Sequence, residues 1–176
     1  AMGVTTVIPN MDPTLPAEVD PENIVRPILD WDITQAFGSP ALWNVVGQHC
    51  EQHQLKLPTL RRVLSAGAPV PDHVLQRMKQ AISEDGDIHT PYGATEALPV
   101  ATIAASEVLG GTTEQTSQGA GTCVGRRFSG ILWKVIRIDD APIESIEEIE
   151  ELPSGEIGEL IVQGPVITTE YVTRTE

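Results

Sequence analysis

Three segments of the chain combine a helix-start signal with apolar residues at helical spacing. The start signals are Asp20-Pro21, Ser39-Pro40 and Pro71-Asp72, in which a capping or acidic residue stands beside a proline. Proline suits the first turn of a helix because the amide hydrogen that it lacks would have no intrahelical partner there. Each pattern therefore predicts a helix, and the second helix is predicted to run to about residue 52. The predicted buried stripes are Ile24, Ile28 and Leu29 in the first helix and Val74, Leu75, Met78 and Ile82 in the third.

Short apolar segments between these helices predict strands at residues 33–37, 62–65 and 87–89. Strands that alternate with helices are typical of a sheet whose strands run mainly parallel. The first half of the chain is therefore predicted to be an α/β unit with a small parallel sheet. Several prolines between residues 9 and 21 predict an irregular segment ahead of it.

The pattern changes near Leu109. Residues 109–121 are mostly Gly, Thr, Gln and Ser, which predicts a flexible loop. Apolar segments at 131–138 and 157–162 then predict strands, separated by an acidic linker whose one candidate helix is 143–152. Strands without helices between them favour an antiparallel, barrel-like β subdomain. The predicted divisions are an irregular N-terminal segment (1–19), an α/β subdomain (20–108), a flexible loop (109–121) and a truncated antiparallel β subdomain (122–176).

Charge and composition argue against several classes of partner. The net charge is -14 and aromatic residues make up 4% of the chain, so neither a basic surface nor a base-stacking surface for nucleic acid or anionic membrane is predicted. No apolar run reaches the length of a transmembrane helix, and no signal peptide is visible. Cys50 and Cys123 fit neither a disulfide framework nor a metal site, so a reducing cytoplasm is the predicted location.

His49 and His53 stand four residues apart on the second predicted helix. Two histidines at this spacing bind zinc in some enzymes, but Cys50 occupies the position where that motif requires glutamate. A solvated helix face is therefore favoured over a metal site.

The segment with the richest chemistry follows the strand predicted at 87–89. Tyr92 offers a flat face for a ring, and Gly93 permits close approach of the backbone. Thr95 supplies a hydroxyl, and Glu96 supplies a hard carboxylate suited to Mg²⁺. Open α/β sheets bind ligands at the carboxyl ends of their strands, where this segment is predicted to lie. A structural turn with a polar end is an equally good interpretation of the spacing alone.

A second candidate, Ser65-Ala66-Gly67-Ala68-Pro69, follows the strand predicted at 62–65. Its small side chains would let a planar group lie against the backbone. From spacing alone, a tight strand-to-helix turn is the favoured interpretation. If both turns bind one ligand, Gly67 and Ala68 are expected to face Tyr92 across a crevice.

Together these segments resemble the adenylate-forming superfamily of acyl-CoA synthetases, luciferases and peptide synthetase adenylation domains. Tyr92-Gly93-Ala94-Thr95-Glu96 resembles the Tyr-Gly-x-Thr-Glu signature of that family, and residues 65–69 resemble its adenine-side turn. Val124-Gly125-Arg126 and the segment 155–160, Gly-Glu-Ile-Gly-Glu-Leu, resemble two further family motifs in the same order. The olefin β-lactone synthetases and the fatty-acyl-CoA ligases are the branches that look most similar.

The resemblance implies roles for individual residues. Gly67, Ala68, Pro69, Tyr92, Gly93 and Ala94 would hold the nucleotide, Thr95 would meet the α-phosphate, and Glu96 would bind Mg²⁺. Phe37, Gly38, Ser39, Ala97 and Leu98 would line the channel for the acid. The implied reaction activates a fatty or β-hydroxy fatty acid with ATP to an acyl-adenylate and passes the acyl group to a thiol, with coenzyme A as a candidate, or to an internal hydroxyl.

Three parts of the family's machinery have no counterpart among these residues. None of Lys56, Lys79 and Lys134 lies in a Gly-rich phosphate loop, the ribose-binding Thr-Gly-Asp segment expected after Tyr171 is missing, and so is the C-terminal lid. The chain is therefore expected to be an internal piece of the enzyme that is inactive alone and needs the N- and C-terminal parts of the same protein. The alternative is a non-catalytic nucleotide- or acyl-binding module on the same scaffold.

Overall fold

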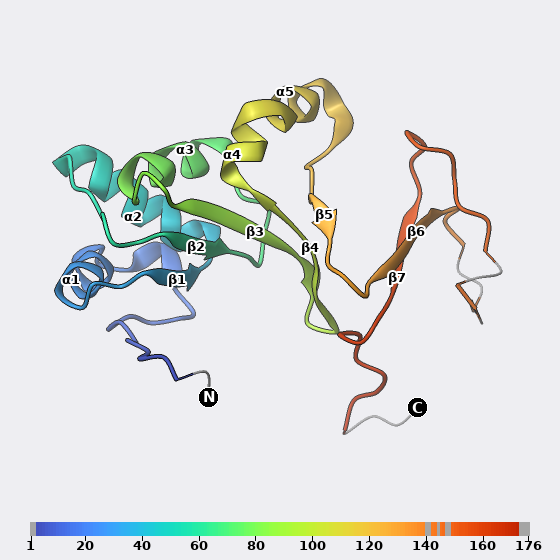
Figure 1. The fold of residues 1–176 in the computed structure, drawn as a ribbon, viewed down its shortest axis with the longest axis horizontal. Coiled ribbons are helices and arrows are strands. Elements are labelled where there is room, and N and C mark those ends of the chain that lie inside the picture. The colour runs from blue at the N-terminus through green and yellow to red at the C-terminus, as the bar shows by residue number, and fades with distance from the viewer. Residues whose placement is uncertain (1–2, 140–141, 144, 147–148, 173–176) are drawn as a thin grey trace. The chain divides into compact units, whose positions relative to one another are not determined.

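The computed structural model describes residues 3–139, 142–143, 145–146 and 149–172. The chain forms two compact units, which Figure 1 shows as ribbons. The first unit comprises Ala1–Pro91 and Ile103–Gly125, and the second comprises Tyr92–Thr102 and Arg126–Glu176. Each unit has its own hydrophobic core, and each is described by itself.

Parallel strands form the centre of the first unit. They are β1 (Gln35–Gly38), β2 (Arg62–Ser65) and β3 (Asp87–Ala94). β2 is the central strand, and its Arg62 pairs with Gln35 on one side and Asp87 on the other. Both pairings are parallel, and the strands lie side by side in Figure 1. The predicted mainly parallel α/β sheet is thus confirmed.

Helices form at the three segments in which proline predicted a helix start. They are α1 (Glu22–Asp30), α2 (Pro40–His53) and α3 (Asp72–Ala81), and a short 3₁₀ helix, η1 (Pro16–Glu18), precedes them. α2 is capped by Ser39, whose Oγ accepts a hydrogen bond from the Leu42 amide at 3.3 Å. Ahead of α1, Oδ1 of Asp20 accepts from the Glu22 amide at 3.1 Å. These caps satisfy amide groups that have no partner inside the helix.

Side chains from these helices and strands share one core. Trp43 of α2 is 1% exposed, and its Nε1 donates to the Leu64 carbonyl oxygen at 3.2 Å, so the one polar atom of the indole is satisfied. The predicted stripe of α3 is buried, whereas Leu29 of α1 is 41% exposed. Val25 is buried instead, because α1 faces the core through Ile24, Val25 and Ile28, and Leu29 lies about 140° round the helix from Ile24.

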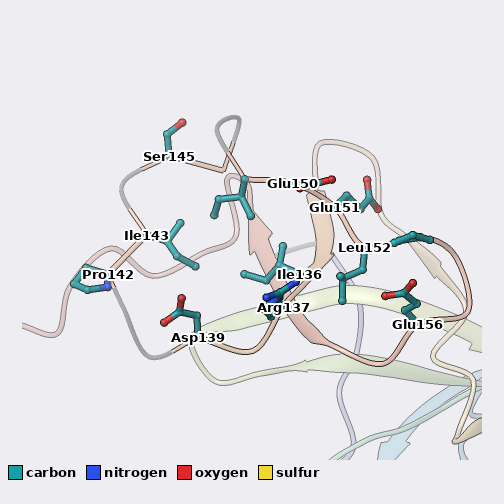
Figure 2. A pocket seen from close by; sticks show the side chains of 12 residues that line it. Ile136, Arg137, Asp139, Pro142, Ile143, Ser145, Glu150, Glu151, Leu152 and Glu156 are labelled. Atoms are coloured by element: carbon teal, nitrogen blue, oxygen red, sulfur yellow. The ribbon is translucent and has the colours of Figure 1, made fainter.

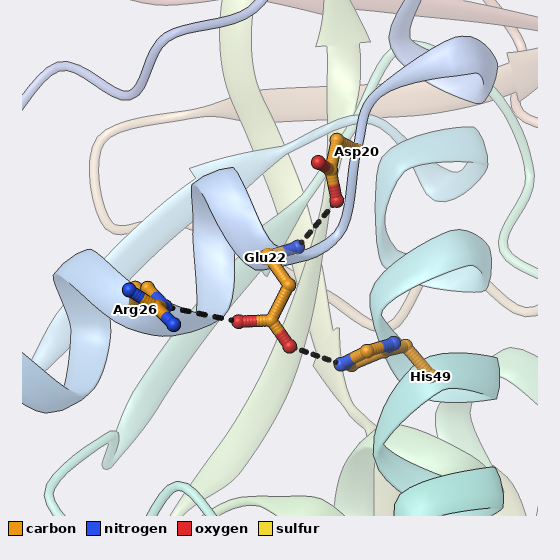
Figure 3. A network of polar contacts seen from close by, with 4 residues as sticks. All are labelled: Asp20, Glu22, Arg26 and His49. Atoms are coloured by element: carbon orange, nitrogen blue, oxygen red, sulfur yellow. Dashed lines mark hydrogen bonds and ion pairs between the residues drawn. The ribbon is translucent and has the colours of Figure 1, made fainter.

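A polar network joins α1 to α2 (Figure 3). Oε1 of Glu22 lies 3.0 Å from Nε2 of His49, and Oε2 lies 3.3 Å from Nε of Arg26. The side chain of His49 is 14% exposed, and its ring centroid lies 4.5 Å from that of His53. His49 is therefore a structural contact between helices, and the prediction of a solvated helix face is wrong at this residue.

Helical turns occupy residues 105–120, where the composition predicted a flexible loop from residue 109. The turns are α4 (Ala105–Glu107), η2 (Val108–Thr112), α5 (Thr113–Gln115) and η3 (Thr116–Ala120), of which η2 and η3 are π-helical. Hydroxyl groups support the wide turns, since Oγ1 of Thr113 donates to the Val108 carbonyl at 3.0 Å and Oγ of Ser117 to that of Glu114 at 2.7 Å. Val108 and Leu109 pack against the first core, which anchors the segment despite its glycines.

A β-hairpin carries the predicted chemical motif. β3 runs to Ala94, five residues beyond its predicted end, and after Thr95 and Glu96 the chain returns as β4 (Ala97–Ala104). Neighbouring strands joined by only two residues are antiparallel. Pro99 weakens the strand signal of this apolar segment, and β4 was not predicted. The chain enters the second unit within β3, leaves it within β4, and enters it again after Gly125.

The second unit contains antiparallel strands, as predicted. β5 (Arg126–Arg127) pairs antiparallel with β4, which gives the sheet order β1-β2-β3-β4-β5, and β6 (Leu132–Ile136) pairs antiparallel with β7 (Glu159–Gln163). Residues 144, 147 and 148 of the candidate helix at 143–152 lie outside the described residues, and the described ones are not helical. The core of the unit consists of Ala97, Val100 and Ile131, with Trp133, Val162 and Ile167 packed against it.

Candidate functional site

Thr95 and Glu96 form the two-residue turn between β3 and β4. Both residues are exposed, so the hydroxyl and the carboxylate are accessible to a ligand at the tip of the hairpin. The flanking strands β3 and β4 end and begin at the edges of this turn. The structure thus places the two predicted catalytic residues at the exposed end of a hairpin.

Gly93 is required by the hairpin itself. A Cβ atom at this position would overlap the Ala97 carbonyl oxygen and would lie 3.0 Å from Cδ1 of Leu98. The close approach that the sequence suggested for a ligand is therefore made by the opposing strand. Tyr92 and Leu98 are 41% and 50% exposed, and Ala94 is also exposed. Ala97, by contrast, is 9% exposed and belongs to the core of the second unit.

The segment after β7 is attached to this turn at three points. Ile167 forms an antiparallel bridge with Ala97, and the Thr168 amide donates to the Glu96 carbonyl oxygen at 2.7 Å. The phenol of Tyr171 donates to Oε1 of Glu96. This hydrogen bond lowers the pKa of the Glu96 carboxyl below its ordinary value, and the same carboxylate raises the pKa of the Tyr171 phenol.

Sequence reasoning missed Tyr171 as a partner of the motif. It lies 75 residues from Glu96 along the chain, and no spacing rule connects positions so far apart. The signal available was the family resemblance, in which the Thr-Gly-Asp segment is expected after Tyr171.

The turn after β2 lies in the first unit. Gly67, Ala68 and Pro69 are all exposed, and Gly67 has φ +98°, which favours glycine. A Cβ on Gly67 would meet no atom within 4 Å, so the space beside this backbone is open. Ser65, just before the turn, is 1% exposed, and its Oγ has no hydrogen-bond partner among the described residues.

Residues 37–39, predicted to line a channel, end β1 and begin α2. Phe37 is 67% exposed, which leaves its ring available to a ligand or to another part of the protein. Gly38 is buried, and a Cβ there would lie 2.5 Å from Cδ2 of Leu42. The hydroxyl of Ser39 caps α2. Gly38 and Ser39 therefore have structural roles at the junction between β1 and α2.

The structure also has two cavities whose lining contains none of these residues. One of about 700 Å³ lies in the second unit, and Figure 2 shows Ile136, Arg137 and Leu152 among its lining side chains. The other, of about 200 Å³, lies in the first unit beside Cys50 and Arg77. Burial raises the pKa of the Cys50 thiol to about 11, and the nearby negative charge of Glu22 adds to this effect. Neither cavity is lined by a predicted site residue.

The hairpin turn can bind Mg²⁺ only together with ligands from another molecule, such as a nucleotide. The described part of the chain holds no group of three or more His, Cys, Asp or Glu side chains that could bind a metal ion by themselves. Mg²⁺ is commonly bound through one or two carboxylates together with the phosphates of a nucleotide, and the exposed carboxylate of Glu96 suits that arrangement. Across the same described residues, no helix is long and apolar enough to cross a membrane.

Comparisons with known proteins agree with the fold. An olefin beta-lactone synthetase of Stenotrophomonas maltophilia (strain K279a) is 44% identical over 176 residues, which is 100% of this chain and 31% of that protein. One from Xanthomonas campestris pv. campestris is 42% identical over 174 residues, 99% of this chain and 30% of that protein. The crystal structure of a long-chain-fatty-acid-CoA ligase from Archaeoglobus fulgidus is similar with a TM-score of 0.63 at 22% identity, over 88% of this chain and 29% of that chain.

The parallel sheet followed by antiparallel strands is the fold that this chain shares with the fatty-acid-CoA ligase structure. Residues 1–172 match the model of the AMP-binding enzyme family, and the chain belongs to that family. It spans about a third of the length of the curated relatives that it matches, at 31% and 30%. The predicted resemblance is confirmed.

Proposed function

We propose that the protein containing this chain is an ATP-dependent, AMP-forming ligase that activates a fatty or β-hydroxy fatty acid. The observation that carries the proposal is the exposed Thr95-Glu96 turn at the tip of the β3–β4 hairpin, within a Tyr-Gly-Ala-Thr-Glu motif. The relatives named olefin beta-lactone synthetase support the choice of a β-hydroxy acid. This chain covers part of such an enzyme, and the remaining parts of the same protein complete the site.

The reaction has two steps. The carboxylate of the acid attacks the α-phosphorus of ATP, the bond to the bridging oxygen breaks, and pyrophosphate leaves with the electron pair. A thiol, with coenzyme A as a candidate, or the hydroxyl of the same acid then attacks the acyl carbon, loses its proton, and expels AMP. The second of these acceptors closes a β-lactone.

Individual residues are assigned roles within this scheme. The hydroxyl of Thr95 donates to an oxygen of the α-phosphate, where negative charge develops during attack. Glu96 would hold Mg²⁺, which would supply positive charge to neutralise the phosphates. The open backbone at Gly67, Ala68 and Pro69 and the exposed ring of Tyr92 contribute to nucleotide binding, and Phe37 and Leu98 contribute to acid binding. Positioning and electrostatics of this kind supply most of the catalysis in phosphoryl and nucleotidyl chemistry.

The test is carboxylate-dependent exchange of labelled pyrophosphate into ATP. The full-length protein is expected to catalyse exchange with fatty or β-hydroxy fatty acids, and Glu96→Gln is expected to lower the rate by about a hundredfold or more. Glu84→Gln, which removes an exposed carboxylate in the turn before β3, is the matched control and is expected to retain activity. The 176-residue chain alone is expected to show no exchange.

Two results would contradict the proposal. Full exchange by the isolated chain would mean that the active site has been assigned to the wrong residues. Absence of exchange by the full-length protein with every acid tried would favour a non-catalytic nucleotide- or acyl-binding module.

A further inference from the structure

The strap formed by residues 164–171 after β7 holds the motif turn from outside the motif. Its Ile167 packs against the core of the second unit and bridges Ala97, which places the strap against the first residue of β4. The bond from the Thr168 amide to the Glu96 carbonyl oxygen, at 2.7 Å, fixes the backbone of the turn. The phenol of Tyr171 then reaches the side chain of the same glutamate.

The hydrogen bond from Tyr171 restricts the Glu96 side chain in a particular way. A glutamate on an exposed turn samples several rotamers, and each of them directs its carboxylate elsewhere. The phenol engages Oε1 and leaves the lone pairs of Oε2 accessible, because Glu96 is exposed. A carboxylate oriented through one oxygen can offer the other to a cation. Partners of this kind are known to orient metal-binding carboxylates and to strengthen their binding.

We propose that Tyr171 is a positioning residue that orients the Glu96 carboxylate for a divalent cation bound together with a nucleotide. This inference rests on the proposed function, in which Glu96 is the metal ligand. Tyr171 touches neither the substrate nor the reacting atoms in this role; it acts through Glu96. The strap therefore couples the β6–β7 sheet to the metal-binding turn within the second unit.

The experiment measures cation binding rather than turnover. Mn²⁺ replaces Mg²⁺ because it takes the same oxygen ligands, and the electron paramagnetic resonance signal of free Mn²⁺ reports how much is bound. The full-length protein is titrated with Mn²⁺ in the presence of α,β-methylene-ATP, which cannot react. The variants are Tyr171→Phe, Glu96→Gln, the double variant, and Glu170→Gln as a control that removes a neighbouring exposed carboxylate of the strap.

Tyr171→Phe is expected to raise the Mn²⁺ concentration for half-saturation about tenfold, because partner groups of ligands typically contribute tenfold or more to metal affinity. Glu96→Gln is expected to weaken binding at least as much. The double variant is expected to match Glu96→Gln alone, since Tyr171 has no effect once its partner carboxylate is gone. The Mn²⁺ concentration for half-saturation of Glu170→Gln is expected to stay within about twofold of that of the unmodified protein, because Glu170 is not a partner of Glu96.

Other outcomes separate this inference from the function on which it rests. If Glu96→Gln weakens Mn²⁺ binding but Tyr171→Phe leaves it unchanged, the positioning role is overturned while Glu96 remains the metal ligand. The same conclusion follows if Tyr171→Phe strengthens Mn²⁺ binding. If the two substitutions weaken binding additively, Tyr171 acts elsewhere and the inference is again overturned. A lower melting temperature of Tyr171→Phe with unchanged Mn²⁺ affinity would show a structural role only. If Glu96→Gln binds Mn²⁺ normally, the metal assignment fails, and the positioning role fails with it.

Discussion

Replacing Gly93 by alanine tests whether the motif glycine serves the ligand or the hairpin. The added Cβ would overlap the Ala97 carbonyl oxygen and would lie 3.0 Å from Cδ1 and 3.2 Å from Cα of Leu98. Two of these three neighbours are backbone atoms, which cannot move aside as the end of a flexible side chain can. The two strands must therefore separate around the Thr95-Glu96 turn.

Overpacking of this kind costs about 1–3 kcal/mol of unfolding free energy. For a chain of this size, each kcal/mol lowers Tm by about 2–4 °C, so Gly93→Ala is expected to lower Tm by roughly 2–12 °C. Thermal unfolding followed by circular dichroism, without any nucleotide, measures this directly. If the glycine served ligand approach alone, stability without ligand would not change.

Two other glycines supply matched controls for the same substitution. Gly110, in the π-helical turn η2, has open space around a Cβ, so Gly110→Ala is expected to leave stability unchanged or to raise it by up to about 1 kcal/mol. Gly67→Ala adds no clash but must adopt φ +98°, and a cost of about 1–2 kcal/mol is expected from backbone strain alone. A Gly93→Ala protein as stable as the Gly110→Ala protein would refute the steric argument.

Three further changes probe the first unit. Trp43→Phe leaves the Leu64 carbonyl oxygen without its 3.2 Å partner and opens space in the core, so chemical denaturation is expected to show a loss of about 2–4 kcal/mol; a loss below 0.5 kcal/mol would contradict this. Ser39→Ala removes the cap of α2 and is expected to cost about 1 kcal/mol, whereas Ser39→Asp is expected to retain the cap. The pKa of the Cys50 thiol is about 11 in the folded state, whereas in the unfolded state the thiol loses its proton near the ordinary pKa of 9.0. Stability is therefore expected to be full below pH 9 and to fall between pH 9 and 11. In Cys50→Ala this fall is expected to be smaller, and a pH profile of unfolding identical to that of the unmodified protein would contradict the assignment.

Much of the first unit could be predicted because its signals act over a few residues. A serine and a proline are enough to start α2, and short apolar segments between helices are enough to indicate parallel strands. The adenylate motif could be recognised for the same reason, since Tyr92 to Glu96 are consecutive residues. The apolar stripe of α3 followed from helical periodicity alone, and the structure buries it.

Other features depended on where distant segments come together. Residues 109–121 have the composition of a loop, but Val108 and Leu109 pack on a core made elsewhere in the chain and hold the segment in helical turns. Pro99 obscured β4, which pairing with its neighbours in the sheet stabilises. Ala97 was expected in a channel, and the contacts of the second unit bury it.

The sequence by itself determined the family and the parallel direction of the first three strands, and it pointed to Glu96 as the candidate metal ligand. Only the tertiary structure decided what surrounds that carboxylate. Tyr171 reaches Glu96 across 75 residues because β7 and the bridge from Ile167 to Ala97 direct the strap back to the turn. A hydrogen bond between such positions depends on the complete path of the chain, whereas caps, turns and periodic stripes depend on neighbours that the sequence already places side by side.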